Sequence, residues 1–106
     1  MQLNEVIATR KKEFETLCSR HNVKYLFAFG SSISDRFDPT KSDIDLLVEV
    51  TYEDPIIRGE MLISLWDSLE KFFARRVDLL TDASIKNPFL RKSIDSTKVL
   101  IHDGSG

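Results

Sequence analysis

The sequence predicts an α/β (α+β) fold, in which a small mixed sheet of three to four strands is flanked by helices. Short apolar runs rich in β-branched and aromatic side chains lie at residues 23–29, 43–50 and 77–81. Stretches whose apolar residues are three, four and seven positions apart precede the first run and separate the second from the third. Strands that alternate with amphipathic helices are typical of a layered domain built on one sheet.

Length and composition limit the classes of protein. The 106 residues fit a single domain, residues 1–106. The net charge of −2, from 15 basic and 17 acidic residues, creates no strong positive field, so direct nucleic-acid binding is not predicted. No apolar run approaches the roughly 18 residues of a membrane span, and the single cysteine, Cys18, excludes an internal disulfide. We therefore expect a cytoplasmic protein with no membrane attachment.

Residues 2–21 predict one amphipathic helix. Its apolar residues recur at helical spacing and line one face, with Cys18 among them as a core residue. Asn22 follows as a tolerated C-terminal residue. We expect His21, a lone histidine at the helix end, to be structural rather than a metal ligand or a base.

The next two elements are predicted to be strands. Residues 23–29 form the first strand, which Gly30 ends. A short helical turn to about Phe37 and a turn over residues 38–42 lead to the second strand, residues 43–50. Because side chains alternate along a strand, one face of the second strand carries Ile44, Leu46, Val48 and Val50, and the other carries Asp43, Asp45, Leu47 and Glu49.

A long helix is predicted from Pro55 to about Ala74. Asp54 is a suitable N-cap, and proline is favoured at the first helical position. Trp66 lies at the edge of the apolar stripe, so we regard it, with Phe37, as a candidate for partner contact. The side chains expected to be buried are Ile57, Met61, Leu62, Leu65, Leu69, Phe72 and Phe73.

Three further elements complete the chain. Residues 77–81 predict a third strand. Asn87 followed by proline repeats the cap-then-proline signal and begins a helix over residues 88–96. Residues 97–102 predict a short final strand.

The connections predict how the strands pair. Residues 30–42 are a short link, so the first two strands are expected to be antiparallel neighbours. The long helix between the second and third strands is a crossover, which makes those two strands parallel. This topology brings Gly30, Ser31, Asp43, Asp45 and Asp78 to the same end of the sheet.

The aspartates suggest a metal site. Asp43 and Asp45 are two positions apart on a strand, so both carboxylates project to one face, and their repulsion is relieved by a cation. Oxygen ligands suit Mg²⁺. Asp78 can complete a second metal site and take the proton from an attacking hydroxyl, as in two-metal centres with ions roughly 3.5–4 Å apart.

The residues that follow the first strand suggest phosphate binding. Gly30 has no side chain to keep a phosphate away from the backbone. Ser31 and Ser32 can supply hydroxyls and the N–H groups of a helix start, which favour anions. Together with the aspartates, these residues predict a site for a metal-bound triphosphate.

The same residues resemble a known family. Gly30-Ser31, followed by eleven residues and then Asp43-Ile44-Asp45, resembles the Gly-Ser…Asp-x-Asp motif of the polymerase-beta-type nucleotidyltransferase superfamily. The short chain and the run SDIDLLV resemble its minimal nucleotidyltransferase (MNT) domain, as found in HEPN–MNT toxin–antitoxin pairs. The resemblance covers nearly the whole chain and implies a nucleotidyltransferase-like fold.

The resemblance also implies an activity. It implies a Mg²⁺-dependent enzyme, with two ions, that transfers a nucleoside monophosphate from ATP or another NTP to a hydroxyl of a partner protein. The implied partner is a small helical HEPN-like toxin, modified on a tyrosine, with the chain acting as antitoxin. On this resemblance Gly30 and Ser31 hold phosphate, Asp43 and Asp45 ligate metal, and Asp78 is the third carboxylate.

Two alternatives remain open at this point. Ile33-Ser34-Asp35 stand where the family usually has Ala-Arg-Gly, which motivates a non-catalytic antitoxin that neutralises its partner by complex formation alone. A nucleotidyltransferase for small molecules such as antibiotics is the other alternative. It would need a dimer to build an acceptor pocket, because the chain is short.

Overall fold

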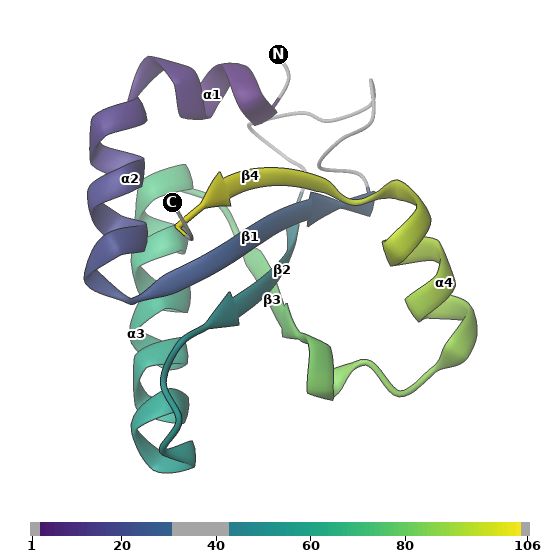
Figure 1. Ribbon diagram of the computed structural model, residues 1–106. Coiled ribbons are helices and arrows are strands. Elements are labelled where there is room, and N and C mark those ends of the chain that lie inside the picture. Colours follow the sequence, from purple (N-terminus) through teal and green to yellow (C-terminus); the bar gives the residue numbers. More distant parts are fainter. Residues whose placement is uncertain (1–2, 31–42, 105–106) are drawn as a thin grey trace.

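A computed structural model describes residues 3–30 and 43–104 of the chain (Figure 1). The described elements, in chain order, are α1 (Leu3–Thr9), α2 (Lys11–Arg20), β1 (Val23–Phe29), β2 (Ile44–Val50), α3 (Pro55–Phe73), β3 (Val77–Thr81), the 3₁₀ turn η2 (Asp82–Ser84), α4 (Pro88–Thr97) and β4 (Val99–Asp103).

The strands form one mixed sheet in the order β3-β2-β1-β4. Strand β1 is antiparallel to both β2 and β4, whereas β2 and β3 run parallel. The parallel pair is joined by α3, as a crossover connection requires. The predicted α+β fold, with its mixed sheet of up to four strands, is confirmed.

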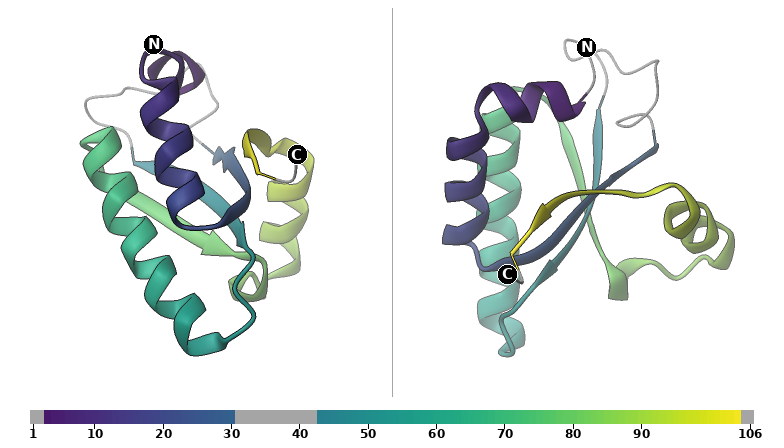
Figure 2. Two further views of the ribbon diagram at one scale, coloured as in Figure 1. Left: turned by 60° about the vertical axis from the view of Figure 1, so that its left-hand side comes forward. Right: turned by 45° about the horizontal axis from the view of Figure 1, so that its top comes forward.

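The helices lie on both sides of the sheet. Helices α1, α2 and α3 lie together on one side, and α4 lies on the other (Figure 2). The larger buried cluster joins α1, α2 and α3 to the sheet through side chains such as Phe14, Leu46 and Leu69. The smaller cluster, on the α4 side, consists of Phe29, Leu47, Ile85 and Ile94, with Phe27 and Leu80 packed against it.

The alternation predicted for β2 is confirmed. Ile44, Leu46 and Val48 belong to the larger cluster, and Leu47 belongs to the smaller one. Asp45 is two positions before Leu47 and therefore lies on the α4 side of the sheet.

The single helix predicted over residues 2–21 is wrong, because the chain breaks at Arg10. This residue has φ −133° and ψ 40°, outside the helical region. Its guanidinium donates to the carbonyl of Phe72 at 2.6 Å, lies 4.2 Å from the centre of the Phe72 ring and pairs with Glu13. The contacts to Phe72, at the end of α3, hold the break in place. The spacing of apolar residues within residues 2–21 cannot reveal contacts to a residue so far along the chain.

The bounds of α3 follow its sequence signals. The Asp54 carboxylate accepts the N–H of Ile56 at 2.9 Å, and Ala74 ends the helix in the left-handed region at φ 52°. Leu65, Leu69, Phe72 and Phe73 are buried as predicted, and Met61 and Leu62 are half-buried. The prediction that Ile57 is buried is wrong, because this residue is 46% exposed. The first turns of α3 extend past the end of the sheet (Figure 1), so no strand lies beneath them.

One of those turns contains a glycine that helix geometry does not require. A Cβ added at Gly59 would have no heavy atom within 4 Å. We therefore expect Gly59→Ala to raise the free energy of unfolding by about 0.5–1 kcal/mol, because alanine loses less backbone entropy in a helix. Urea unfolding followed by circular dichroism measures this change. An unchanged or lower free energy of unfolding would contradict it.

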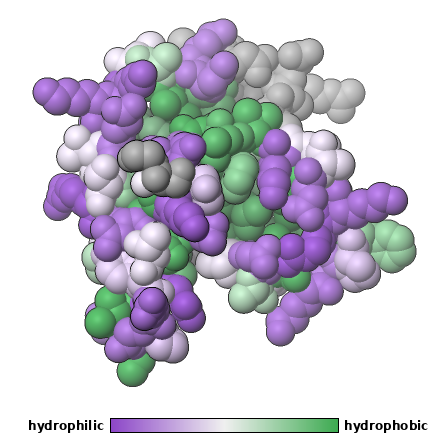
Figure 3. Space-filling model, viewed as in Figure 1, coloured by the Kyte–Doolittle hydropathy of each residue, from purple (hydrophilic) through white to green (hydrophobic). Residues whose placement is uncertain are grey.

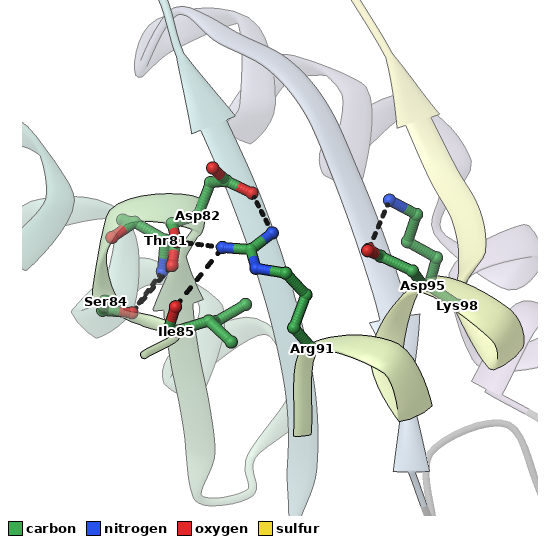
Figure 4. Close-up of polar contacts among 7 residues, drawn as sticks. All are labelled: Thr81, Asp82, Ser84, Ile85, Arg91, Asp95 and Lys98. Atoms are coloured by element: carbon green, nitrogen blue, oxygen red, sulfur yellow. Dashed lines mark hydrogen bonds and ion pairs between the residues drawn. The ribbon is translucent and has the colours of Figure 1, made fainter. Parts of the chain in front are cut away.

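A short turn and one arginine fix α4 against the end of β3. Figure 4 shows the Arg91 side chain reaching from α4 to η2. It donates to the Asp82 carboxylate and carbonyl, both at 2.8 Å, and to the Ile85 carbonyl at 3.3 Å. At the start of α4, the Asn87 side chain accepts from the N–H groups of Phe89 and Leu90, as its cap signal predicted. The 3₁₀ turn η2 was not among the elements predicted from the sequence.

Side chains close the outer edge of β3 at both of its ends. The indole Nε1 of Trp66 donates to the Val77 carbonyl at 2.7 Å, and the Val77 N–H donates to the Glu70 carboxylate at 2.9 Å. At the other end, the Thr81 N–H donates to the Ser84 hydroxyl at 3.1 Å, and that hydroxyl donates to the Thr81 carbonyl at 2.7 Å. Neither end residue of β3 therefore offers its backbone groups to another strand.

Two residues of the first helices have structural roles. Cys18 is fully buried in the larger cluster. The ring nitrogens of His21 contact the Leu17 carbonyl at 2.8 Å and the Ser64 hydroxyl at 3.0 Å. Among the described residues, none of the helices combines the length and the apolar character that a membrane span needs. The turn predicted to reach Phe37, and the turn over residues 38–42, lie outside the described residues.

Candidate active site

The sheet brings three of the predicted acidic residues to one end. Asp45 of β2 is paired in register with Asp78 of β3, and on its other side with Phe29 at the end of β1. Asp43 immediately precedes β2. Asp45 and Asp78 lie on the α4 side of the sheet, since each is two positions before a leucine that packs there, Leu47 and Leu80 respectively.

Gly30 follows β1 and lies against the Asp45 carboxylate. Its φ is 64°, in the left-handed region that favours glycine. A Cβ at this position would stand 2.6 Å from Oδ2 of Asp45, closer than non-bonded atoms approach. Only glycine therefore fits both the turn of the backbone and the neighbouring carboxylate. Across the sheet, Gly30, Asp45 and Asp78 succeed one another from β1 to β3.

The electrostatics of Asp45 are unusual. Burial raises its pKa to about 6, together with the negative charge of Asp78, a hydrogen bond to the Asp78 side chain and the charge of Asp43. Carboxyl groups that share one region cannot all ionise without cost. A cation placed there would remove that cost, so the site favours binding a positive ion.

The donor set fits Mg²⁺ when substrate completes it. In residues 3–30 and 43–104, no group of three or more His, Cys, Asp and Glu side chains is already arranged around a metal position. The chain instead supplies the close pair Asp45 and Asp78, with Asp43 near enough to affect the Asp45 pKa. Mg²⁺ is typically held by one or two carboxylates plus the phosphates of a substrate, and this arrangement meets that requirement.

A pocket of about 520 Å³ opens beside the carboxylate pair. Its polar groups are Asp45 and Asp78, and its walls are apolar. We name it the carboxylate pocket; it is lined by Phe29, Asp45, Trp66, Val77, Asp78, Leu79, Leu80 and Leu90.

Sequence reasoning found only part of this pocket. It singled out the two aspartates and Trp66, but it gave no role to Leu90, which is 43% exposed. A sequence feature that could have indicated Leu90 is the apolar pair Phe89-Leu90 in the first turn of the helix, shortly after its N-cap Asn87. Polar, solvent-facing residues are usual there, so two apolar residues suggest a contact. Ser31, Ser32 and Phe37, which the sequence also singled out, lie outside the described residues.

A second, larger pocket shows that volume alone does not identify the site. It holds about 780 Å³ and is lined by residues of α1, α2 and β4, among them Lys11, Glu15 and His102. None of the predicted site residues lines it.

Comparison with known proteins agrees with the geometry. Residues 10–101 match the family model for the nucleotidyltransferase domain. Two proteins of Methanocaldococcus jannaschii, described as candidate protein adenylyltransferases, are each 34% identical to this chain. These matches cover 94% and 93% of this chain and 95% and 97% of the two relatives.

Solved structures share the fold. A candidate minimal nucleotidyltransferase superimposes with a TM-score of 0.66 at 27% identity, over 93% of this chain and 95% of that one. A toxin–antitoxin structure with AMP-PNP gives 0.57 at 20% identity, over 89% and 73% of the two chains. A tri-AMPylated HEPN toxin of Shewanella oneidensis in complex with its MNT antitoxin gives 0.51 at 19%, over 91% and 71%.

Proposed function

Because this chain belongs to the nucleotidyltransferase domain family and is a nucleotidyltransferase, we propose that it transfers an adenylyl group from ATP to a hydroxyl of a partner protein. The reaction requires Mg²⁺, and the chain acts as the antitoxin of a HEPN–MNT pair. The observation that carries the proposal is the register pair of Asp45 and Asp78 beside Gly30. The relatives described as protein adenylyltransferases support a protein acceptor.

We assign a role to each residue of the site. Asp43 and Asp45 would hold Mg²⁺, which when bound neutralises the charge that develops on the phosphates. Gly30 leaves its backbone open to the phosphates, and Ser31 and Ser32 follow it in the sequence. Residues 1–106 act as one nucleotidyltransferase-like domain in the cytoplasm.

Asp78 is placed to act on the acceptor. Its side chain is exposed, and β3 is an edge strand, so an acceptor can reach it from outside the sheet. The acceptor oxygen forms a bond to the α-phosphorus, the bond from that phosphorus to the bridging oxygen breaks, and pyrophosphate leaves. The hydroxyl proton passes to the Asp78 carboxylate.

The proposal predicts label transfer to the small helical HEPN-like partner protein. Incubation with ATP labelled at the α-phosphate and Mg²⁺ should label that protein, and EDTA should abolish the labelling. Asp78→Asn should lower the rate by about 100-fold or more, as expected for loss of a general base. Asp95→Asn is the matched control, because Asp95 is an exposed aspartate of α4 that pairs with Lys98 (Figure 4).

Two results would contradict the proposal. If the partner is neutralised but stays unlabelled while ATP still binds, the chain acts by complex formation alone. If an added small hydroxylated antibiotic is labelled and the partner is not, the acceptor is a small molecule.

A further inference from the structure

Helix α3 carries an exposed apolar stripe beside the carboxylate pocket. Ile56, Ile63 and Trp66 are 74%, 67% and 46% exposed. With Gly59 they are three, four and three residues apart, the spacing of a seam that packs against another helix. Figure 3 shows apolar surface at the free lower end of α3. At Gly59 there is open space where a side chain would stand, so another chain can approach α3 closely there.

The stripe leads to the carboxylates. A small pocket of about 130 Å³ lies between α3 and β3 and is lined by Leu62, Ile63, Trp66, Leu79 and Thr81. It shares Trp66 and Leu79 with the carboxylate pocket. An occupant of the stripe would therefore be continuous with the carboxylate pocket, in which Asp45 and Asp78 lie.

We propose that the stripe Ile56–Gly59–Ile63–Trp66 docks an amphipathic helix of the acceptor protein whose apolar positions are flanked by lysine or arginine. Docking there places the acceptor hydroxyl at Asp78. The inference rests on the proposed function, because it takes the acceptor to be a protein.

The charges beside the stripe determine which partner it fits. Glu60 is four residues after Ile56, and Asp67 is four residues after Ile63, so both border the stripe. Asp67 also pairs with Lys71 at 2.9 Å, but such an exposed pair contributes little. A second copy of α3 would bring the same acidic border against its own, which is unfavourable, whereas basic flanking residues are complementary.

The edge of β3 favours a helix over an added strand. A strand would have to pair with the outer backbone groups of β3. Those of Val77 are already bonded to Trp66 and Glu70, and those of Thr81 to Ser84. Side-chain docking on α3 needs none of these groups.

A synthetic peptide tests the inference without nucleotide. The peptide has about 20 residues, enough to form a helix, with leucine at the seam positions and lysine beside them. Trp66 is the only tryptophan of the chain, so the NMR signal of its indole N–H reports directly on the stripe. We expect that signal to shift on saturable binding of the lysine peptide and to stay in place with a matched peptide that carries glutamate instead.

Two variants locate the binding. Ile63→Asp should lower the affinity for the lysine peptide about tenfold or more. If binding were purely electrostatic, the added negative charge would raise the affinity instead. Ile57→Asp is the control, because Ile57 is also exposed but is six residues before Ile63 on a different face of α3. It should leave binding unchanged.

Several outcomes would overturn the inference. They are absence of binding, equal binding of both peptides, and binding that Ile63→Asp leaves intact. Self-association in sedimentation equilibrium that Ile63→Asp abolishes would assign the stripe to a second copy. The Asp78→Asn variant should bind the peptide normally, because binding does not need the reaction. If the chain binds the peptide but transfers no label to its partner, only the proposed function is refuted. If it transfers label but does not bind the peptide, only the docking is refuted.

Discussion

Asp45→Asn is expected to lower nucleotidyl transfer by about 100-fold or more and, at neutral pH without Mg²⁺, to make the folded chain more stable. On the role proposed for Asp45, transfer falls because asparagine removes a charged oxygen that would hold Mg²⁺. Stability rises because asparagine has no charge to bury beside Asp78 and Asp43. Burial, followed by the charge and hydrogen bond of Asp78 and the charge of Asp43, raises the Asp45 pKa to about 6.

The pH dependence of stability follows from that pKa. The ordinary value is 3.8, and the folded value is about 6. Below the lower value both states are protonated. Between the two pKa values the folded state keeps the proton and the unfolded state has lost it, so unfolding releases a proton and the free energy of unfolding falls as pH rises. Above the folded pKa both states are ionised, and the free energy of unfolding falls no further. Because Asp45 is partly exposed, we expect a loss of only about 1 kcal/mol.

Urea unfolding at pH 4 and pH 8 in EDTA measures this effect. The gain from Asp45→Asn should be present in full at pH 8 and much smaller at pH 4, which lies just above the ordinary pKa of 3.8. A parallel assay of label transfer measures activity. An equal gain at both pH values, or a variant less stable than the parent chain at pH 8, would show that burial and the neighbouring carboxylates do not destabilise ionised Asp45 in the folded state.

Gly30→Ala is expected to reduce transfer by about tenfold to 100-fold and to lower the free energy of unfolding by about 1–2 kcal/mol. The left-handed φ of 64° strains any residue with a Cβ. The new Cβ would also stand 2.6 Å from Oδ2 of Asp45, so the carboxylate has to move. Small displacements of a catalytic group are costly because the reacting atoms need close alignment.

Initial rates of label transfer and urea unfolding measure the two effects of Gly30→Ala. Gly59→Ala is the matched control for the unfolding measurement only, since the same substitution in the open turn of α3 should stabilise the chain. It is not a control for transfer, because Gly59 belongs to the stripe proposed to dock the acceptor. Unchanged activity in Gly30→Ala would show that the Asp45 carboxylate position beside Gly30 is not needed for the reaction.

The sheet and the carboxylate pair could be predicted because each depends on a local signal. The apolar runs identify β1, β2 and β3, and the helix between β2 and β3 makes that pair parallel. Register then follows from the position of each aspartate near the start of its strand, which is why Asp45 and Asp78 are neighbours. The resemblance to the nucleotidyltransferase family is confirmed by the family model and by the relatives.

What could not be predicted depends on contacts between distant residues. The break at Arg10 is held by the Phe72 carbonyl, 62 positions away. The exposure of Ile57 follows from how far α3 extends past the sheet, which periodicity does not reveal. Leu90 becomes a wall of the carboxylate pocket through tertiary contacts of α4, which Arg91 joins to η2 and Ile94 packs against the sheet.

The closed edge of β3 has a consequence for solubility. An open strand edge is a template on which other chains can pair and aggregate. The side chains of Trp66 and Glu70 bond to the backbone carbonyl and N–H of Val77, and the Ser84 hydroxyl bonds to those of Thr81. This five-residue strand therefore has few free backbone groups for such pairing. The strand that carries Asp78 can therefore expose side chains at the edge of the sheet while the backbone groups of its two end residues are unavailable for pairing with another chain.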